Sequence, residues 1–343
     1  MRSYFVHRRS MKLRAILAGA LLAAARSFGG DGAVGHVSQE GADASGVVAT
    51  DVWSGAACCG ELDPAGCDCG LFDGRRRFLQ SDHAFDDFIQ PVSNPIFARD
   101  PRSSTHARFL FINNWTPDTH AVAPDDQIQV YAVQVNLALT ERLSLLAEKD
   151  GYAVINRGPL SEGLLNLAVG LKYAFLRRPE RQFIVSGGLM FEAPTGESAV
   201  LQGDGSGVLT PFLSAGKGWG AFHTIANMGL SIPMDDDANS GFFYWQQHFD
   251  YVVADWFAPL VEFNWFHYTS GGDRGIPSAV GEGDGLLNFG TTGMAGADLV
   301  TVAVGARFRL THWLSSGLVW ETPISSRKDL IDNRIVLDVI LRY

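Results

Sequence analysis

Side chains of alternating hydrophobicity recur through the second two-thirds of the chain and constrain its fold more than any other feature. In residues 163–176 one parity is apolar and the other small or polar: Leu165, Leu167, Val169, Leu171, Tyr173 and Phe175 alternate with Asn166, Ala168, Gly170, Lys172 and Ala174. Residues 300–309 repeat the pattern. Because successive side chains of a strand point to opposite faces, a period of two predicts β-strands with one apolar and one polar face.

Twelve such segments follow one another to the C-terminus. They lie at about 104–116, 126–140, 143–154, 163–176, 181–195, 207–217, 219–233, 242–254, 257–270, 297–310, 312–324 and 333–343. Most are long enough to cross an outer membrane, for which about 9–11 tilted residues suffice. Such strands have a mean hydropathy near zero, and the chain's value of +0.05 agrees with this.

The connections between these segments alternate in length. Tight turns at 140–142, 177–180, 216–220, 254–257 and 311–313 alternate with longer stretches, of which 271–296 is the longest. Transmembrane barrels have short periplasmic turns and longer external loops. We therefore predict an all-β fold: a transmembrane, antiparallel, up-and-down β-barrel of about 12 strands in the bacterial outer membrane, spanning 104–343 with both ends in the periplasm.

The last segment ends on an aromatic residue at the C-terminus. Val339, Leu341 and Tyr343 share the apolar parity there. This pattern resembles the C-terminal signal that outer-membrane barrels present to the barrel-assembly machinery, so we predict that these residues are an assembly signal. The alternative is an amphipathic strand without that role. Tryptophans near the segment ends, such as Trp219 and Trp313, are typical of interfacial girdles.

The N-terminus has the features of an export signal. Basic residues precede the apolar run 15–25, which is too short to span a bilayer, so we predict a signal peptide over 1–25. Met11 is an alternative start. We predict that residues 26–103 lie in the periplasm: 26–80 as a flexible leader, and the proline-containing part 81–103 as an ordered approach to the first strand.

The leader contains all of the cysteines. Cys58, Cys59, Cys67 and Cys69 form a compact, even-numbered set, which in an oxidising compartment suggests two disulfides of undetermined pairing. A metal site is the alternative, but the spacing is not a standard zinc pattern. Lipid attachment at Cys58 is disfavoured because that residue lies far beyond the apolar run. We predict no metal and no cofactor.

Four segments carry a resemblance to a known family: PTGESAVLQGDGSGVLTPFLSAGKGWG, SIPMDDDANSGFFYWQQHFDY, PLVEFNWFHYTSGGDR and VTVAVGARFRLTHWLSSGLVWETPIS. Together they resemble a bacterial family of outer-membrane barrels labelled as transporters or as meta-pathway phenol-degradation proteins. The resemblance covers about 190–343. It implies the barrel fold and the passage of small molecules, aromatic ones among them, across the outer membrane.

Charged residues on the polar parity define a candidate lumen. They are Lys172, Glu192, His248, Asp250, Glu262, Arg307, Arg309, Glu321, Asp338 and Arg342. They either line a hydrated path with electrostatic preferences or pair with one another and close the interior. The first alternative predicts a porin-like channel for small, aromatic or apolar solutes. The second predicts a structural or adhesion barrel with a closed lumen.

Other functions are disfavoured. A net charge of −10 without basic clusters in the barrel argues against a nucleic-acid partner. The chain lacks a P-loop and a dinucleotide fingerprint, and a TonB-dependent receptor needs a 22-stranded barrel. The loop 203–207 lacks the carboxylate spacing of a calcium loop. The acidic loops at Asp235–Asp237 and at Asp273, Glu282 and Asp284 are expected to be solvated, or to meet divalent ions that bridge lipopolysaccharide.

A lipid-modifying enzyme is the most remote alternative. His267 lies on the lipid-facing parity near the outer end of a strand, where a lipid substrate would be accessible. A catalytic Ser–His pair needs hydrogen-bond reach and an orienting third group. Position 269 is Thr and Ser270 falls on the opposite face, so we expect His267 to be an interfacial polar residue.

Overall fold

The computed structural model describes residues 77–121, 124–155 and 161–343. The predicted signal peptide and Cys58, Cys59, Cys67 and Cys69 lie outside the described residues. Among the described residues, no helix has the length and apolar character needed to cross a membrane. The two helical turns there are single 3-10 turns, η1 (Pro179–Arg181) and η2 (Ser198–Val200).

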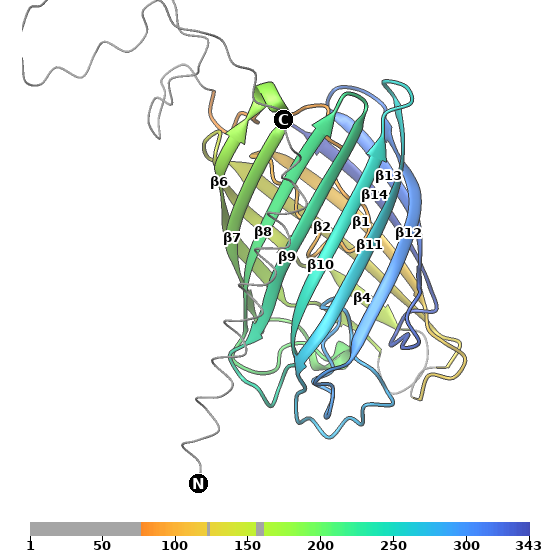
Figure 1. Ribbon diagram of the computed structural model, residues 1–343. Helices are drawn as coiled ribbons and strands as arrows, with labels where there is room; N and C mark the ends of the chain where they lie inside the picture. The colour runs from red at the N-terminus through yellow and green to blue at the C-terminus, as the bar shows by residue number, and fades with distance from the viewer. Residues whose placement is uncertain (1–76, 122–123, 156–160) are drawn as a thin grey trace, which may run out of the picture. The chain divides into compact units, whose positions relative to one another are not determined.

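Strands dominate the described part of the chain and belong to one antiparallel sheet (Figure 1). They are β1 (His106–Trp115), β2 (Gln127–Ala138), β3 (Leu143–Lys149), β4 (Tyr152–Ile155), β5 (Glu162–Leu164), β6 (Leu167–Arg178), β7 (Phe183–Ala193), β8 (Val208–Trp219), β9 (Phe222–Pro233), β10 (Gly241–Tyr251), β11 (Phe257–Ser270), β12 (Asp298–Arg309), β13 (Leu314–Pro323) and β14 (Asn333–Arg342). Each long strand pairs with its neighbour in the chain, and β1 pairs with both β2 and β14. The sheet therefore closes on itself.

Two of the wall strands are interrupted. The segments β3 and β4 both pair with β2, and they continue one another across Asp150 and Gly151. Gly151 has a positive φ of 111°, a conformation that glycine adopts readily. The segments β5 and β6 pair with β4 and β3 in the same way. When β3 and β4 are counted as one strand, and β5 and β6 as another, the described residues form the 12-stranded barrel that the alternation predicted.

The two faces of the wall divide as the parity predicts. On β6, the apolar side chains from Leu167 to Phe175 are about half exposed, for example 52% for Val169, whereas Ala168 and Lys172 are buried. Exposed apolar side chains on a barrel wall form its lipid-facing surface. Leu165 was expected to share this outer face, but it is 2% exposed. It lies in the break between β5 and β6, where the change of register turns it inward.

The loops also sort as predicted. The connections β2–β3, β6–β7, β8–β9, β10–β11 and β12–β13 are tight, and the longer ones lie at the opposite end, where 271–297 is the longest in the described residues. Trp219, Trp256, Trp313 and Tyr343 are exposed beside the tight turns. Aromatic side chains at this level are typical of an interfacial girdle.

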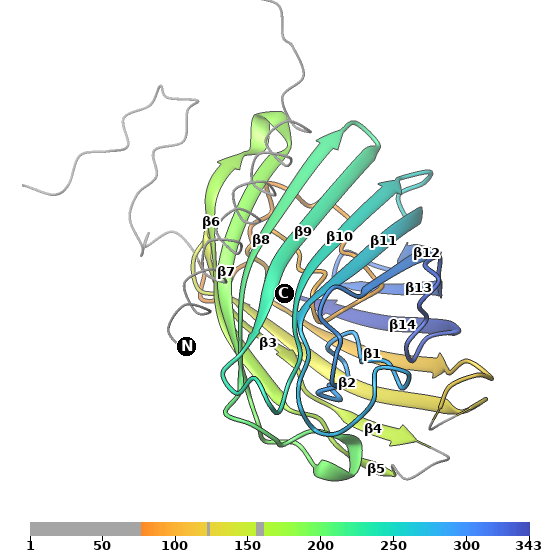
Figure 2. The same ribbon diagram turned by 60° about the horizontal axis from the view of Figure 1, so that its bottom comes forward.

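Residues 81–103, called the plug segment below, begin beside Tyr343 at the end with the tight turns and lie inside the barrel, where the sequence had not placed them. Figures 1 and 2 show this segment in orange, enclosed by the strands. It has no helix or strand, and most of its side chains are buried, among them Phe85, Phe88, Val92 and Phe97. The prediction failed because the inward-facing polar side chains of the wall bind this segment, and periodicity does not reveal such contacts.

Candidate functional site: the occupied lumen

Wall side chains bind the backbone of the plug segment at its centre. Glu262 of β11 accepts hydrogen bonds from the amides of Val92 and Ser93, at 2.8 and 2.6 Å. Arg108 of β1 donates to the carbonyl oxygens of Pro91 and Val92 at 3.0 and 3.1 Å. A buried backbone without secondary structure needs such partners. These two charged side chains replace the water that would otherwise solvate the segment.

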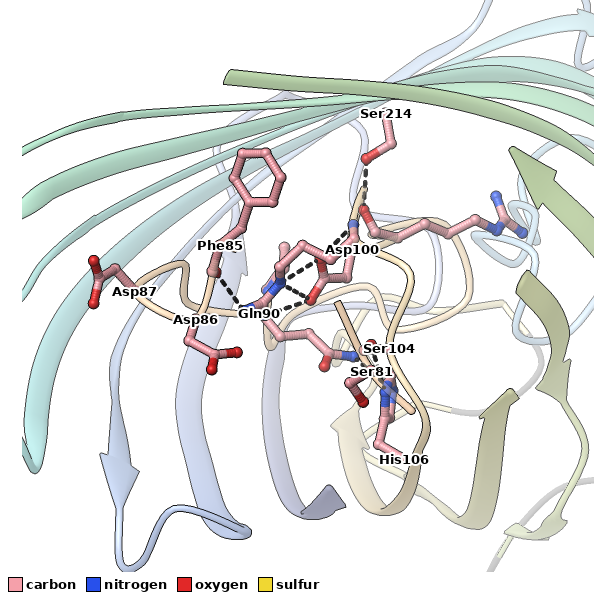
Figure 3. Close-up of polar contacts among 12 residues, drawn as sticks. Ser81, Phe85, Asp86, Asp87, Gln90, Asp100, Ser104, His106 and Ser214 are labelled. Carbon is pink, nitrogen blue, oxygen red and sulfur yellow. Dashed lines mark hydrogen bonds and ion pairs between the residues drawn. The ribbon is translucent and has the colours of Figure 1, made fainter. Parts of the chain in front are cut away.

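The C-terminal half of the plug segment is held by a second group of contacts. Arg99 forms a 2.6 Å ion pair with Glu148 of β3 and donates to the hydroxyl of Tyr244 at 2.8 Å. Ser214 of β8 donates to the carbonyl oxygen of Arg99 at 2.8 Å (Figure 3). The amine of Lys172 donates to the carbonyl oxygens of Asp100 and Arg102. This half is therefore tied to strands from both sides of the barrel.

The plug segment also has internal structure. Arg102 donates to both carboxylate oxygens of Asp100 at 2.9 Å and to the carbonyl oxygen of Phe85 at 2.9 Å (Figure 3). The side chains of Asp100 and Arg102 are almost completely buried. A buried charge without a partner is costly, and the pair removes that cost within the segment itself. The bond to Phe85 joins the beginning of the segment to its end.

Aromatic packing supplies the apolar part of the site. The ring of Phe97 lies 4.5 Å from that of Tyr244 and 5.5 Å from that of Phe242, measured between centroids. Phe266 lies 6.2 Å away, and the guanidinium of Arg99 sits 4.4 Å from the centroid of Phe212. Such contacts each add about 0.5–1.5 kcal/mol beyond area burial. The centre of the lumen is thus partly apolar.

The ten candidate lumen residues occupy strands β6, β7, β10, β11, β12, β13 and β14. Buried among them are Lys172, His248, Asp250, Glu262, Arg307, Glu321 and Asp338, whereas Glu192, Arg309 and Arg342 are partly exposed. They divide into two kinds by their partners. Some bind the plug segment, and others bind one another.

Wall-to-wall ion pairs join several of these side chains. Asp338 accepts from Arg108 at 2.7 Å and from Arg307 at 2.8 Å. His248 bridges two carboxylates, with Nδ1 2.6 Å from Glu262 and Nε2 3.0 Å from Asp250. Glu192 pairs with Lys149 at 2.6 Å. Mutual pairing, one of the two alternatives weighed from the sequence, is therefore present, whereas contacts to the plug segment were in neither alternative. Arg108 and Glu262 take part in both kinds of contact.

Several side chains that bind the plug segment were not among the candidates. Arg108, Gln134 and Glu148 lie on β1, β2 and β3, and parity along these strands places them inward. Extending the parity argument to all polar inward positions would have found them. Arg99 and Arg102 had no such signal, because they lie outside the strands.

The longest external loop, 271–297, folds over the outer end of the lumen. Glu282 accepts hydrogen bonds from the amide of Thr291 at 2.9 Å and from the hydroxyl of Ser240 at 2.5 Å. Asp284 forms a 2.6 Å ion pair with Arg334 of β14. Both carboxylates are buried, so the expectation of a solvated acidic loop was wrong for Glu282 and Asp284. Burial raises the pKa of Glu282 above its usual value.

His267 and Ser270, the residues considered for the enzyme hypothesis, bind different partners. Nδ1 of His267 lies 2.9 Å from a carboxylate oxygen of Asp298, and the indole of Trp265 donates to the same oxygen at 2.8 Å. The hydroxyl of Ser270 accepts from the amide of Gly241 at 3.1 Å. His267 thus belongs to a polar cluster at the outer rim of the wall.

Comparison with solved structures agrees with this architecture. A COG4313 outer membrane channel from Pseudomonas putida F1 aligns with a TM-score of 0.52 at 15% identity, covering 75% of this chain and 100% of that chain. The chain therefore has the fold of an outer-membrane β-barrel. The NanC porin aligns with a TM-score of 0.45 at 8% identity over 70% of this chain and 100% of that chain. No family model and no curated protein matches the sequence.

Proposed function

We propose that this outer-membrane barrel is a passive channel for small solutes and that it conducts when the plug segment rearranges. One observation supports this most strongly: charged wall side chains bind the backbone of the plug segment, as Glu262 binds Val92 and Ser93. Moving the segment would expose these polar groups to water. A hydrated path lined with charge is what a solute channel requires.

Two further observations agree with the proposal. The plug segment has no strand of its own and is not part of the hydrogen-bonded sheet, so its displacement opens a path without unfolding the wall. The solved structure with a TM-score of 0.52 is described as an outer membrane channel. The sequence resemblance extends the proposal to small, aromatic or apolar solutes.

A reversible cross-link tests whether the plug segment controls conduction. The side chain of Asn264 donates to the hydroxyl of Ser93 at 3.1 Å, so Ser93→Cys with Asn264→Cys joins the middle of the segment to β11. The four native cysteines are replaced by serine beforehand. We expect oxidation to reduce conductance in planar bilayers to the baseline, and a reductant to restore it, because the segment can no longer move.

A second cross-link is the matched control. The hydroxyls of Ser103 and Ser144 lie 3.0 Å apart, next to the point where the segment joins β1. Ser103→Cys with Ser144→Cys tethers only this end, so conductance should persist after oxidation. Equal conductance of the oxidised and reduced Ser93–Asn264 variant would refute gating by the segment.

The alternative function is a structural or adhesion barrel with a permanently closed lumen. The ion pairs that join wall strands, such as Arg307 with Asp338, favour this alternative. Absence of ion or solute flux through the unmodified protein under every condition would support it and overturn the channel proposal. Conductance is therefore the measurement that separates the two functions.

A further inference from the structure

A cavity at the periplasmic end of the lumen has no role in the contacts described so far. It has a volume of about 380 Å³ and lies between the beginning of the plug segment and the ends of β12, β13 and β14. Small-molecule sites typically have volumes of about 300–1,000 Å³. The lining combines cationic side chains with an apolar wall that includes Phe88, Trp313 and Leu314.

Two guanidinium groups in this cavity have no carboxylate partner in an ion pair of the described residues. The Nε of Arg342 is buried without a hydrogen-bond partner there. Arg309 donates to the carbonyl oxygens of Asp86 and Asp87, at 3.2 and 2.7 Å, and the nearby carboxylates of Asp86, Asp87 and Asp250 act on its charge without forming an ion pair with it. By contrast, Arg307, which also lines the cavity, forms an ion pair with Asp338, a carboxylate that it shares with Arg108.

The other polar groups of the cavity leave this positive character in place. Asp86 is the carboxylate of the lining, and one of its oxygens lies 2.9 Å from Nδ1 of His83. His312 adds a further imidazole. Gln90 is 4% exposed, and its side-chain oxygen is buried without a hydrogen-bond partner among the described residues. The cavity therefore offers one buried, unpaired donor, Nε of Arg342, beside the partly exposed guanidinium of Arg309.

We propose that this cavity binds the anionic head of a small amphiphilic solute, a monocarboxylate with a short apolar body. Arginine recognises carboxylates through charge-assisted hydrogen bonds, and a buried guanidinium without a partner gains most from one. The apolar body would lie against Phe88, Trp313 and Leu314. The arginine side chains of this lining contrast with the net charge of −10 of the whole chain. The site deepens the proposed channel function, since it would be the last binding position of a solute before the periplasm.

Isothermal titration of the full-length protein in detergent tests the site without any flux measurement. Hexanoate is the probe, and 1-hexanol and hexylamine are its uncharged and cationic counterparts. Empty micelles at the same detergent concentration serve as the blank. We expect hexanoate to bind and its counterparts to bind at least about tenfold more weakly, because they cannot accept charge-assisted bonds from arginine. Equal binding of hexanoate and 1-hexanol would overturn the proposal.

Two variants locate the binding. Arg342→Gln and Arg309→Gln should each weaken hexanoate binding about tenfold, whereas Arg181→Gln should leave it unchanged because Arg181 is exposed in the η1 turn outside the cavity. Arg342 lies next to the C-terminus, so Arg309→Gln provides the test if assembly of the first variant fails. Unchanged binding in Arg309→Gln would contradict the assignment. Since binding is measured directly, its failure is distinguishable from a barrel that conducts nothing.

Discussion

At the scale of single residues, Glu262 connects the plug segment to the charge network of the wall. One of its carboxylate oxygens accepts from Val92 and contacts His248, and the other accepts from Ser93. Hydrogen bonds to charged groups contribute about 1.5–3 kcal/mol each. The side chain therefore stabilises the occupied state of the lumen by more than any neutral contact of the segment.

Glu262→Gln should loosen the plug segment while keeping the size of the side chain. The amide retains one acceptor oxygen and presents an NH₂ group to the other backbone amide. A loss of about 1.4 kcal/mol changes an equilibrium tenfold, so we expect open events in planar bilayers to become about tenfold more frequent. Glu192→Gln is the control, because Glu192 contacts Lys149 and Asn166 in the wall. An equal increase in both variants would contradict a specific role of Glu262.

At the scale of elements, the plug segment and the loop 271–297 occupy the lumen from opposite sides of its centre. Gly285 of the loop lies against Phe97 of the segment. Burial of a large apolar side chain contributes about 1.5–3 kcal/mol, and Phe85, Phe88, Ile89, Val92 and Phe97 are all buried. Complete ejection of the segment would therefore cost roughly 7–15 kcal/mol. We expect opening to involve only part of it.

The loop should respond to pH through Glu282. Its pKa is raised by burial, so the folded loop binds the proton more tightly than the unfolded loop. The stabilising effect is fully present below the unfolded value near 4.5 and is lost as the pH rises through the higher folded value. Protection factors for hydrogen exchange of residues 275–291, which correct for the intrinsic pH dependence of exchange, should accordingly be higher near the lower limit of this window than above it. Glu282→Gln should remove the difference.

Other titratable groups near the loop also contribute to the pH dependence of its stability. Burial also raises the pKa of Asp329, which faces the loop with its partner Arg327, and Asp284 is fixed by Arg334. Burial lowers the pKa of His120, whose Nε2 contacts the carbonyl oxygen of Val280. Its protonation therefore destabilises the loop as the pH falls from 6.5 towards the lower folded value. A pH response that survives in Glu282→Gln would assign the effect to these neighbours.

At the scale of the whole molecule, the sequence predicts the wall better than its contents. Period-two alternation is a local property, and it located the strands, the short turns and most inward side chains, including Lys172 and Asp338. The break at Leu165 escaped because the interruption between β5 and β6 shifts parity without a distinctive residue. The plug segment escaped because residues 81–103 have no period, and its position depends on contacts with distant residues such as Glu148 and Glu262.

Removal of residues 77–103 should lower the stability of the barrel and raise its conductance. Glu262, Arg108 and Lys172 would lose their partners on the segment, and Phe242 and Tyr244 would lose contact with Phe97. Water entering the lumen can solvate the charges but not the rings, so the loss of aromatic burial should dominate. We expect a lower unfolding temperature by circular dichroism together with a higher conductance in planar bilayers. Unchanged conductance in the shortened barrel would show that the segment does not obstruct the path.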